Sequence, residues 1–216
     1  MPVILSGSEK GGSGKSTLAT IIAGMAAARG GDVALLDADP QGTAATWCAA
    51  RRSQDVPPVP VSSATGNLSA AVQRLTAAHA LVVIDAGGRD SIELRSGLVS
   101  ADVLLLPIEP SSADAWVLPA MAELVEEARR HGGPADVVTV ISKGYADSRI
   151  PENDDLRALL RSIDALPAPA AMLCARVDYK RALGLGLTPE ELPASPKAID
   201  EAQQLYDALQ RFDALP

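Results

Sequence analysis

One short stretch constrains the fold of this chain more than any other: residues 8–17, Ser-Glu-Lys-Gly-Gly-Ser-Gly-Lys-Ser-Thr. It follows an apolar run at residues 3–5 and leads into an alanine- and isoleucine-rich segment with the composition of a helix. A glycine-rich loop between a strand and a helix can wrap phosphates, because backbone N–H groups line it and the helix N-terminus adds its positive end. Lys15 would then reach the β- and γ-phosphates of a nucleotide, and the Ser16 hydroxyl would bind Mg²⁺.

The loop departs from the ordinary phosphate-loop pattern at one position. The pattern G-x-x-x-x-G-K-[ST] requires glycine five places before Gly14, and this chain has Glu9 there. The loop instead contains a second lysine, Lys10. A carboxylate beside phosphates is unfavourable, so we expect Glu9 to turn outward or to pair with a cation.

Short apolar runs alternate with stretches of helical composition, which is typical of a parallel sheet covered by helices on both faces. Because of Pro119, the helix expected after Asp114 should start near Leu118 or be kinked. The pattern predicts one doubly wound, mostly parallel α/β domain over residues 1–216, of the P-loop NTPase type. We predict strands at residues 3–5, 33–36, 81–84, 103–106, 137–141 and 170–173, an extended edge segment at 56–61, and helices at 16–29, 42–52, 67–78 and 194–212.

Carboxylates follow two of the predicted strands, and in a parallel sheet ligands bind where the strands end. Asp85 follows four apolar residues, the position at which a carboxylate holds Mg²⁺ through its water shell. Asp37 and Asp39 follow the second strand, and their spacing places both carboxylates on the same side. We expect one to support the metal shell and the other to position the attacking water; the alternative is a solvated turn.

Composition narrows the classes of protein. A net charge of −8 argues against a globally basic nucleic-acid binder but leaves a local basic patch open. Cys48 and Cys174 lack metal-ligand spacing and suit small buried side chains in a reducing compartment. No run approaches the ~18 apolar residues of a membrane span, and no basic leader precedes the first strand. We therefore expect a cytoplasmic protein.

These motifs together resemble the deviant Walker A ATPases of the ParA/MinD superfamily, and most closely the small plasmid-partition ParA type. The resemblance rests on the two-lysine loop, on Asp-Ala-Asp-Pro-Gln at residues 37–41 and on the apolar run that ends in Asp85. It continues in Pro-Ile-Glu-Pro-Ser-Ser-Ala-Asp-Ala-Trp at residues 107–116 and, more weakly, in residues 176–198. It thus covers nearly the whole chain.

The resemblance implies an ATPase that forms a nucleotide-sandwich dimer when ATP binds and hydrolyses ATP slowly until a partner protein stimulates it. Three residues would act in catalysis. Lys10 would be the signature lysine that crosses to the nucleotide of the other subunit, Lys15 would hold the phosphates, and Asp39 would position the water. The implied metal residues are Ser16, Asp37 and Asp85, and the implied nucleotide-binding residues are Lys10, Gly11, Gly12, Ser13, Gly14, Lys15, Ser16 and Thr17.

Two further positions depart from the common family pattern. After Asp85 the chain reads Ala-Gly-Gly-Arg, where many relatives have a proline-containing turn; glycines there favour the short plasmid-type subgroup. Ser142 and Lys143 stand where relatives often place an adenine-contacting Asn or Arg. The residues that contact the base are therefore not assigned.

The resemblance also implies non-specific DNA binding by the ATP dimer, through basic residues near the C-terminus. The alternative is an ordinary solvated surface, because acidic residues are interspersed throughout residues 149–213. Contacts between DNA phosphates and a few clustered basic side chains would make DNA binding salt-sensitive. A membrane partner is not expected, because the polar face of the segment 201–216 is mainly acidic. The candidate DNA contacts are Arg176, Lys180, Arg181 and Lys197, with Arg149, Arg157 and Arg161 as extensions.

The leading hypothesis is an ATPase that segregates or positions plasmid or chromosomal DNA, with a small ParB-like centromere-binding or adaptor protein as partner and association with the nucleoid. One alternative keeps the ATPase but changes its cargo to a protein compartment, or makes it a conjugation accessory. A more remote alternative is a dethiobiotin-synthetase-like ligase that phosphorylates a small molecule. No substrate-binding constellation for such an enzyme stands outside the loop region.

Overall fold

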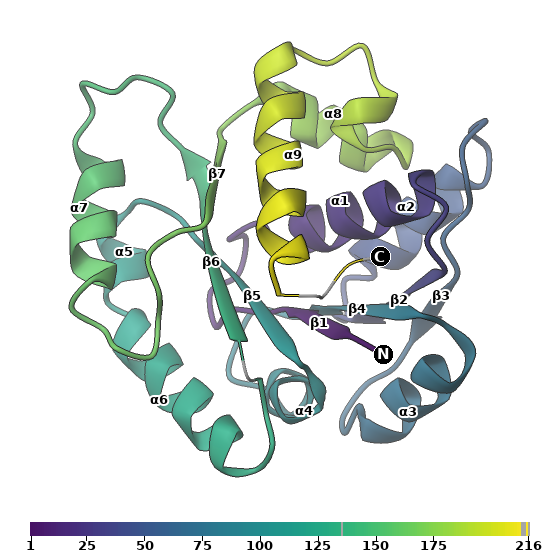
Figure 1. The fold of residues 1–216 in the computed structure, drawn as a ribbon, viewed down its shortest axis with the longest axis horizontal. Coiled ribbons are helices and arrows are strands. Elements are labelled where there is room, and N and C mark those ends of the chain that lie inside the picture. Colours follow the sequence, from purple (N-terminus) through teal and green to yellow (C-terminus); the bar gives the residue numbers. More distant parts are fainter. Residues whose placement is uncertain (135, 213–214, 216) are drawn as a thin grey trace.

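The computed structural model describes residues 1–134, 136–212 and 215. Its centre is a seven-stranded sheet in the order β3-β2-β4-β1-β5-β6-β7, with parallel pairing between all neighbours (Figure 1). The strands are β1 (Val3–Ser6), β2 (Val33–Ala38), β3 (Val61–Ser63), β4 (Leu81–Ala86), β5 (Val103–Ile108), β6 (Asp136–Gly144) and β7 (Ala171–Cys174). The helices are α1 (Lys15–Ala28), α2 (Thr43–Arg51), α3 (Ser69–Ala78), α4 (Ile92–Ser100), α5 (Ser112–Ala115), α6 (Leu118–Arg130), α7 (Glu152–Leu160), α8 (Val177–Leu185) and α9 (Pro196–Gln210), with a 3₁₀ turn, η1 (Pro189–Glu191).

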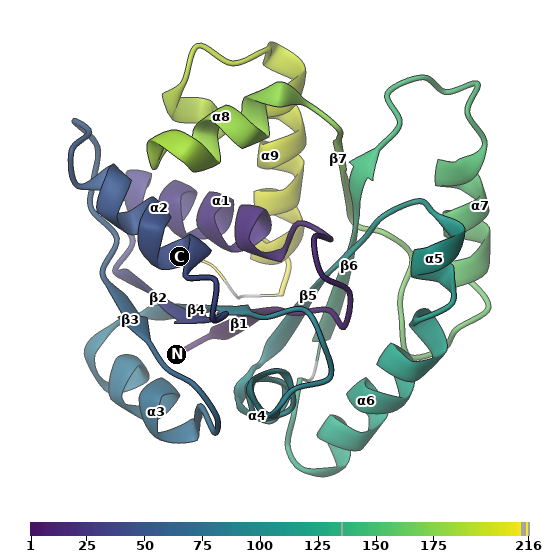
Figure 2. The same cartoon turned by 180° about the vertical axis from the view of Figure 1, so that it is seen from behind.

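Helices cover both faces of the sheet, as the two views of the molecule show (Figures 1 and 2). Ile4 of β1 belongs to the hydrophobic core beneath α1, α2, α8 and α9, whereas its neighbours Val3 and Leu5 belong to the core beneath α3, α4, α6 and α7. Successive side chains of a strand point to opposite faces, so a strand covered on both sides needs apolar residues throughout. The predicted doubly wound α/β fold is confirmed.

Several predicted strand boundaries were wrong, including the ends of β2, β4 and β6, which lie two or three residues further on. In two further cases, at β5 and β3, proline is the reason. We ended the fourth long strand before Pro107, but β5 continues to Ile108. On the side of β5 that faces β1, the Leu105 carbonyl oxygen accepts a hydrogen bond from Gly7 N (3.2 Å). The backbone nitrogen of Pro107, two residues further on, points to this same side, where β1 has already turned into the glycine loop. Its missing N–H therefore breaks no ladder bond. In the predicted edge segment at residues 56–61, the strand β3 begins only at Val61, and the last proline, Pro60, joins the sheet through its carbonyl oxygen, which accepts a hydrogen bond from Leu35 N (2.9 Å).

The helix ends follow local sequence signals. The helical conformation is interrupted between α5 and α6. The second helix begins at Leu118, and Pro119 lies in its first turn, where a missing N–H is tolerated. Ser195 caps α9 by accepting a hydrogen bond from Ala198 N (3.3 Å). Residues 213, 214 and 216, at the end of the predicted terminal helix and tail, lie outside the described residues. Within the described part of the chain, no helix is both long and apolar enough to cross a membrane.

Candidate nucleotide-binding site

The polar residues that follow the strands converge at one edge of the sheet. Strand register places Ser6 beside Asp85 and Asp85 beside Asp37. A cavity of about 950 Å³ opens at this edge. It is lined by the glycine loop and by residues that follow β2, β4 and β5, among them Lys10, Lys15, Ser16, Thr17, Asp39 and Arg89.

The backbone around the cavity requires glycine at defined positions. Gly14 has φ 105°, and a Cβ there would lie 2.5 Å from the Ser142 hydroxyl oxygen. A Cβ on Gly88 would lie 2.7 Å from the Gly11 Cα. The loop after β4 therefore packs directly on the glycine loop, and Gly88 leaves no room for a side chain at this contact.

Lys15 lies inside the cavity wall with its side chain largely buried. Its Nζ donates a hydrogen bond to the carbonyl oxygen of Lys10 at 2.8 Å. Burial lowers the pKa of Lys15, while Asp85 and Asp39 act in the opposite direction. A poorly solvated ammonium held by a single carbonyl can exchange that partner for an anionic phosphate.

Lys10 lines the cavity and forms an ion pair with Asp114 of α5. Asp114 is 2% exposed, and its carboxylate also accepts hydrogen bonds from the Ser111 hydroxyl (2.6 Å) and from Glu109 N (3.2 Å). Asp114 belongs to the family-like segment at residues 107–116, and its Ser-x-x-Asp spacing signals a helix start, but the sequence did not predict its ion pair with Lys10. The ammonium group of the second loop lysine is therefore already paired with a carboxylate.

Asp85 is buried, and neither of its carboxylate oxygens has a hydrogen-bond partner within residues 1–134, 136–212 and 215. Burial, with the nearby charges of Asp37 and Asp39, raises its pKa to about 7. The Ser16 hydroxyl lies close enough to lower that pKa, although it does not meet the geometry of a hydrogen bond. A carboxylate with unused lone pairs beside Ser16 fits a place in a Mg²⁺ shell. In the described ranges no group of three or more His, Cys, Asp or Glu residues could hold a metal, so phosphate and water oxygens would have to complete that shell.

The two carboxylates after β2 occupy different surroundings. Asp37 is buried, and its oxygens accept hydrogen bonds from Asp39 N (3.1 Å) and Ala45 N (2.7 Å), which fixes the turn into α2. Burial raises the pKa of Asp37 in spite of these bonds. Asp39 lines the cavity and accepts a hydrogen bond from Gln41 N (2.9 Å). Of the two, Asp39 is therefore the one placed to contact a molecule in the cavity.

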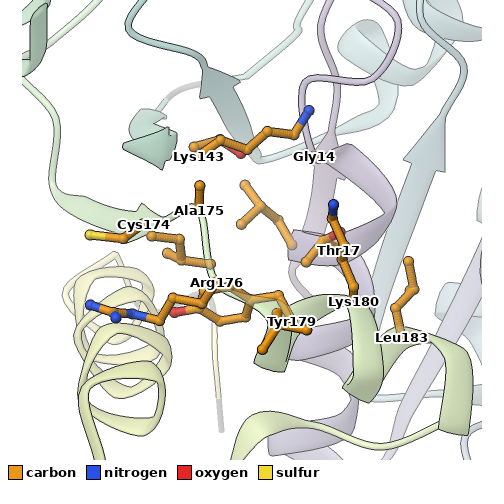
Figure 3. Close-up of a pocket in the computed structure, with 13 residues that line it drawn as sticks. Gly14, Thr17, Lys143, Cys174, Ala175, Arg176, Tyr179, Lys180 and Leu183 are labelled. Atoms are coloured by element: carbon orange, nitrogen blue, oxygen red, sulfur yellow. The ribbon is translucent and has the colours of Figure 1, made fainter. Parts of the chain in front are cut away.

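A second cavity of about 360 Å³ adjoins the glycine loop at Gly14 and Thr17 (Figure 3). Its walls come from α1, the ends of β6 and β7 and the first turns of α8, and they are mainly apolar. Lys143 stands between the two cavities with φ 54°, a left-handed conformation that is unusual for a side-chain-bearing residue. Its Nζ donates to the Gly12 carbonyl and pairs with Glu109 at 2.7 Å. The sequence indicated Lys143 only as a departure from the family pattern.

Comparison with known proteins gives this geometry a family. Residues 4–195 match the family model described as the CobQ/CobB/MinD/ParA nucleotide binding domain. The chain belongs to this family. The resemblance to the ParA/MinD superfamily seen in the sequence is therefore confirmed, and the phosphate-loop cavity is the nucleotide site expected of its members.

Individual relatives agree over most of the chain. The "Maintenance of carboxysome distribution protein A" of Halothiobacillus neapolitanus is 29% identical over 207 residues, covering 92% of this chain and 91% of the relative. "Protein ParA" of Rhizobium radiobacter is 29% identical over 150 residues, covering 66% of each chain. The solved structure of the septum site-determining protein MinD from Pyrococcus horikoshii OT3, complexed with Mg-ADP, superimposes with a TM-score of 0.76 at 14% identity, covering 98% of this chain and 97% of MinD. This last likeness concerns the fold.

The predicted DNA-contacting residues differ in their burial and in their ion pairs. Arg176 is half-buried and pairs with Glu201 at 2.6 Å, so it is not a free cation, and we leave it out of any DNA surface. Lys180 lines both cavities. Arg181 and Lys197 are exposed. Of the possible extensions, Arg149 pairs with Asp147 (2.6 Å) and Arg157 with Asp154 (2.8 Å).

Glu9 lies on the rim of the phosphate-loop cavity. Burial and the neighbouring Asp90 raise its pKa, and Arg95 lowers it. Arg95 is itself bound to Asp90 (2.6 Å) and Glu127 (3.2 Å). The expected cation is therefore close to Glu9, but it is shared with two other carboxylates.

Proposed function

We propose that this chain is a ParA-like ATPase that positions a large cargo by cycling between an ATP-bound sandwich dimer and a released monomer. The observation that carries the proposal is Lys10, a second lysine that lines the same cavity as Lys15. One subunit needs a single loop lysine to bind phosphate. A second lysine whose side chain is partly exposed would contact the nucleotide of a facing subunit.

The residues that line the cavity would have different roles in ATP hydrolysis. The glycine-loop N–H groups and Lys15 would bind the phosphates, and Thr17 would lie near the α-phosphate. Ser16 and Asp85 would hold Mg²⁺, with Asp37 behind them; the ion would neutralise charge on the β- and γ-phosphate oxygens. Asp39 would orient the attacking water. Lys10 of the facing subunit would add positive charge where negative charge grows in the transition state.

The second cavity would take the base and ribose. It adjoins the loop at Gly14 and Thr17, and its mainly apolar walls suit a flat aromatic ring (Figure 3). Lys143 and Lys180 line both cavities, so they would stand close to the bound nucleotide.

The ATP dimer would bind DNA non-specifically, and a small ParB-like centromere-binding or adaptor protein would stimulate hydrolysis. Arg181 and Lys197 remain as exposed candidates for phosphate contacts. Similarity to the Rhizobium radiobacter ParA supports DNA as cargo. Similarity to the Halothiobacillus neapolitanus protein, whose name refers to carboxysome distribution, supports a protein compartment as the second candidate.

Sedimentation of Asp39→Ala with ATP and Mg²⁺ tests the dimer cycle. We expect a stable dimer, because ATP binds but the water is not positioned; a persistent monomer would refute the cycle. DNA binding is then measured with ATP, with ADP and without nucleotide over a salt series. Equal binding in the three conditions would remove nucleotide-gated DNA binding. ATP consumption that depends on a small molecule would instead favour the ligase.

A further inference from the structure

One wall of the proposed base pocket is a short segment that joins the sheet to α8. Cys174 ends β7, Arg176 precedes α8, and Tyr179 lies in its first turn. All three residues line the cavity, and Figure 3 shows them along one side of it. A wall made from a strand end and a helix start has few ladder or helix bonds of its own, so something else must hold its shape.

Glu201 of the terminal helix α9 holds this wall. It is 9% exposed and does not line the cavity itself. Its Oε2 accepts hydrogen bonds from Cys174 N (3.0 Å) and from the Tyr179 hydroxyl (2.7 Å). Its Oε1 accepts one from an Arg176 guanidinium NH2 group at 2.6 Å, and Arg176 Nε lies 3.1 Å from both oxygens.

The carboxylate is held in its charged form. Burial alone would raise the pKa of Glu201, but the hydrogen bonds from Arg176, Tyr179 and Cys174 outweigh burial and keep that pKa below its ordinary value. The side chain is anchored from behind as well, because Ala198, Ala202 and Leu205 of the same helix are buried in the core. Glu201 therefore fixes the cavity wall relative to α9, a helix that is itself packed on the core.

We propose that Glu201 is a positioning residue for nucleotide binding, which sets the wall of the base pocket through Cys174, Arg176 and Tyr179. The inference rests on the proposed function, since it assigns the second cavity to the base. It also explains why Arg176 is not free to contact DNA: its charge is used to fix the wall.

The test compares Glu201→Gln with wild type for binding of Mg-ATP and of Mg-tripolyphosphate, which lacks base and ribose. The amide has the same size but loses the charge and one acceptor oxygen, so we expect ATP to bind about tenfold more weakly. Tripolyphosphate should bind as before, because it would contact the glycine loop alone. The KM for ATP should rise while kcat at saturation stays the same.

Glu191→Gln is the matched control. Glu191 also forms a half-buried pair with a buried arginine, Arg51 (2.7 Å), and accepts a hydrogen bond from Thr188 N (2.8 Å), but none of these residues lines either cavity. The Glu191→Gln substitution should lower the free energy of unfolding without changing the affinity for ATP. If Glu201→Gln does not fold, Tyr179→Phe keeps the ring and removes only the hydroxyl, and ATP should then bind about threefold more weakly.

Several outcomes would overturn the inference. One is a folded Glu201→Gln protein that binds ATP as wild type does; another is an equal loss of ATP and tripolyphosphate affinity. A loss of ATP affinity in Glu191→Gln as large as in Glu201→Gln would also overturn it. Failure of the wild-type protein to bind ATP would be a separate result, because it would refute the proposed function itself.

Discussion

Lys10 of the glycine loop and Asp114 of α5 form an ion pair that joins the phosphate-binding loop to the segment after β5. Asp114 is nearly inaccessible, whereas the Lys10 side chain is 29% exposed. The lysine is therefore the partner that can leave. If ATP drives dimer formation, Lys10 must exchange this carboxylate for the phosphates of the facing subunit, and the pair sets part of the energetic cost of that exchange.

Lys10→Ala should still bind ATP, because Lys15 and the loop N–H groups remain, but it should not dimerise when Mg-ATP is added. Sedimentation velocity measures the dimer. Loss of the pair should also cost about 1 kcal/mol of unfolding free energy, because Asp114 keeps only its bonds from Ser111 and Glu109. The double variant with Asp114→Asn should regain the stability but not the dimer. A Lys10→Ala protein that dimerises normally would contradict the proposed role in the facing subunit.

Gly88→Ala and Gly11→Ala form an internally controlled pair on the two sides of one contact. A methyl group on Gly88 would meet the backbone of Gly11 at 2.7 Å, whereas a methyl group on Gly11 would meet nothing within 4 Å. We expect Gly88→Ala to lower the unfolding free energy by about 1–3 kcal/mol and Gly11→Ala to change it by less than about 0.5 kcal/mol. Chemical denaturation without nucleotide measures both. Equal effects would show that the two loops are not in contact.

Lys143→Gly and Lys143→Ala separate the backbone of Lys143 from its side chain. Both variants lose the contacts to Gly12 and Glu109, but only glycine adopts φ 54° without strain. The glycine variant should therefore be more stable than the alanine variant by about 1 kcal/mol. Their affinities for ATP should be equally reduced. Equal stabilities would argue against a strained backbone at this position.

Glu191→Gln should show a defined pH dependence of stability. Burial raises the pKa of Glu191, but the hydrogen bonds and charge of Arg51 and the bond from Thr188 N outweigh it, so the pKa lies below 4.5. Because the folded-state pKa is depressed, the stabilisation is complete well above pH 4.5 and is lost as the pH falls through the lower folded-state value. At pH 7 the variant should lose about 3 kcal/mol relative to wild type.

Denaturation of both proteins at pH 7 and across the acid range measures this difference. It should shrink as the pH falls from 4.5 toward the lower folded-state pKa, because the unfolded wild-type chain then binds a proton at Glu191 that the folded chain does not. A difference that stays constant with pH would show that the Arg51 pair does not depend on the charge of Glu191.

The periodic features of the fold were predictable because they depend on local sequence. The long strands read as continuous apolar runs, since both faces of the sheet are covered, and the predicted helices at residues 16–29, 42–52 and 67–78 match α1, α2 and α3 within one or two residues at each end. The helices α4, α7 and α8 were not specified. Pro107 led to a predicted end of β5 that was too early, because the sequence does not show that β1 has already left the sheet at that level.

In the candidate site, too, the features that depend on local sequence were predictable and the long-range contacts were not. The residues of the glycine loop and the carboxylates Asp37, Asp39 and Asp85 could be named because each follows a recognisable strand or belongs to a short motif. The partners of those residues lie far away in the chain. Asp114 is separated from Lys10 by 104 positions, and Glu201 from Arg176 by 25.

The sequence by itself determined the fold class, the phosphate-binding loop and the family, because these depend on residue spacing over a few positions. Only the tertiary structure decided which charges are free and which are already paired. Lys10 is held by Asp114, Arg176 is held by Glu201, and Asp85 has no hydrogen-bond partner in the described part of the chain. Charge pairing depends on distance and burial in the folded chain, and neither quantity can be read from the order of residues.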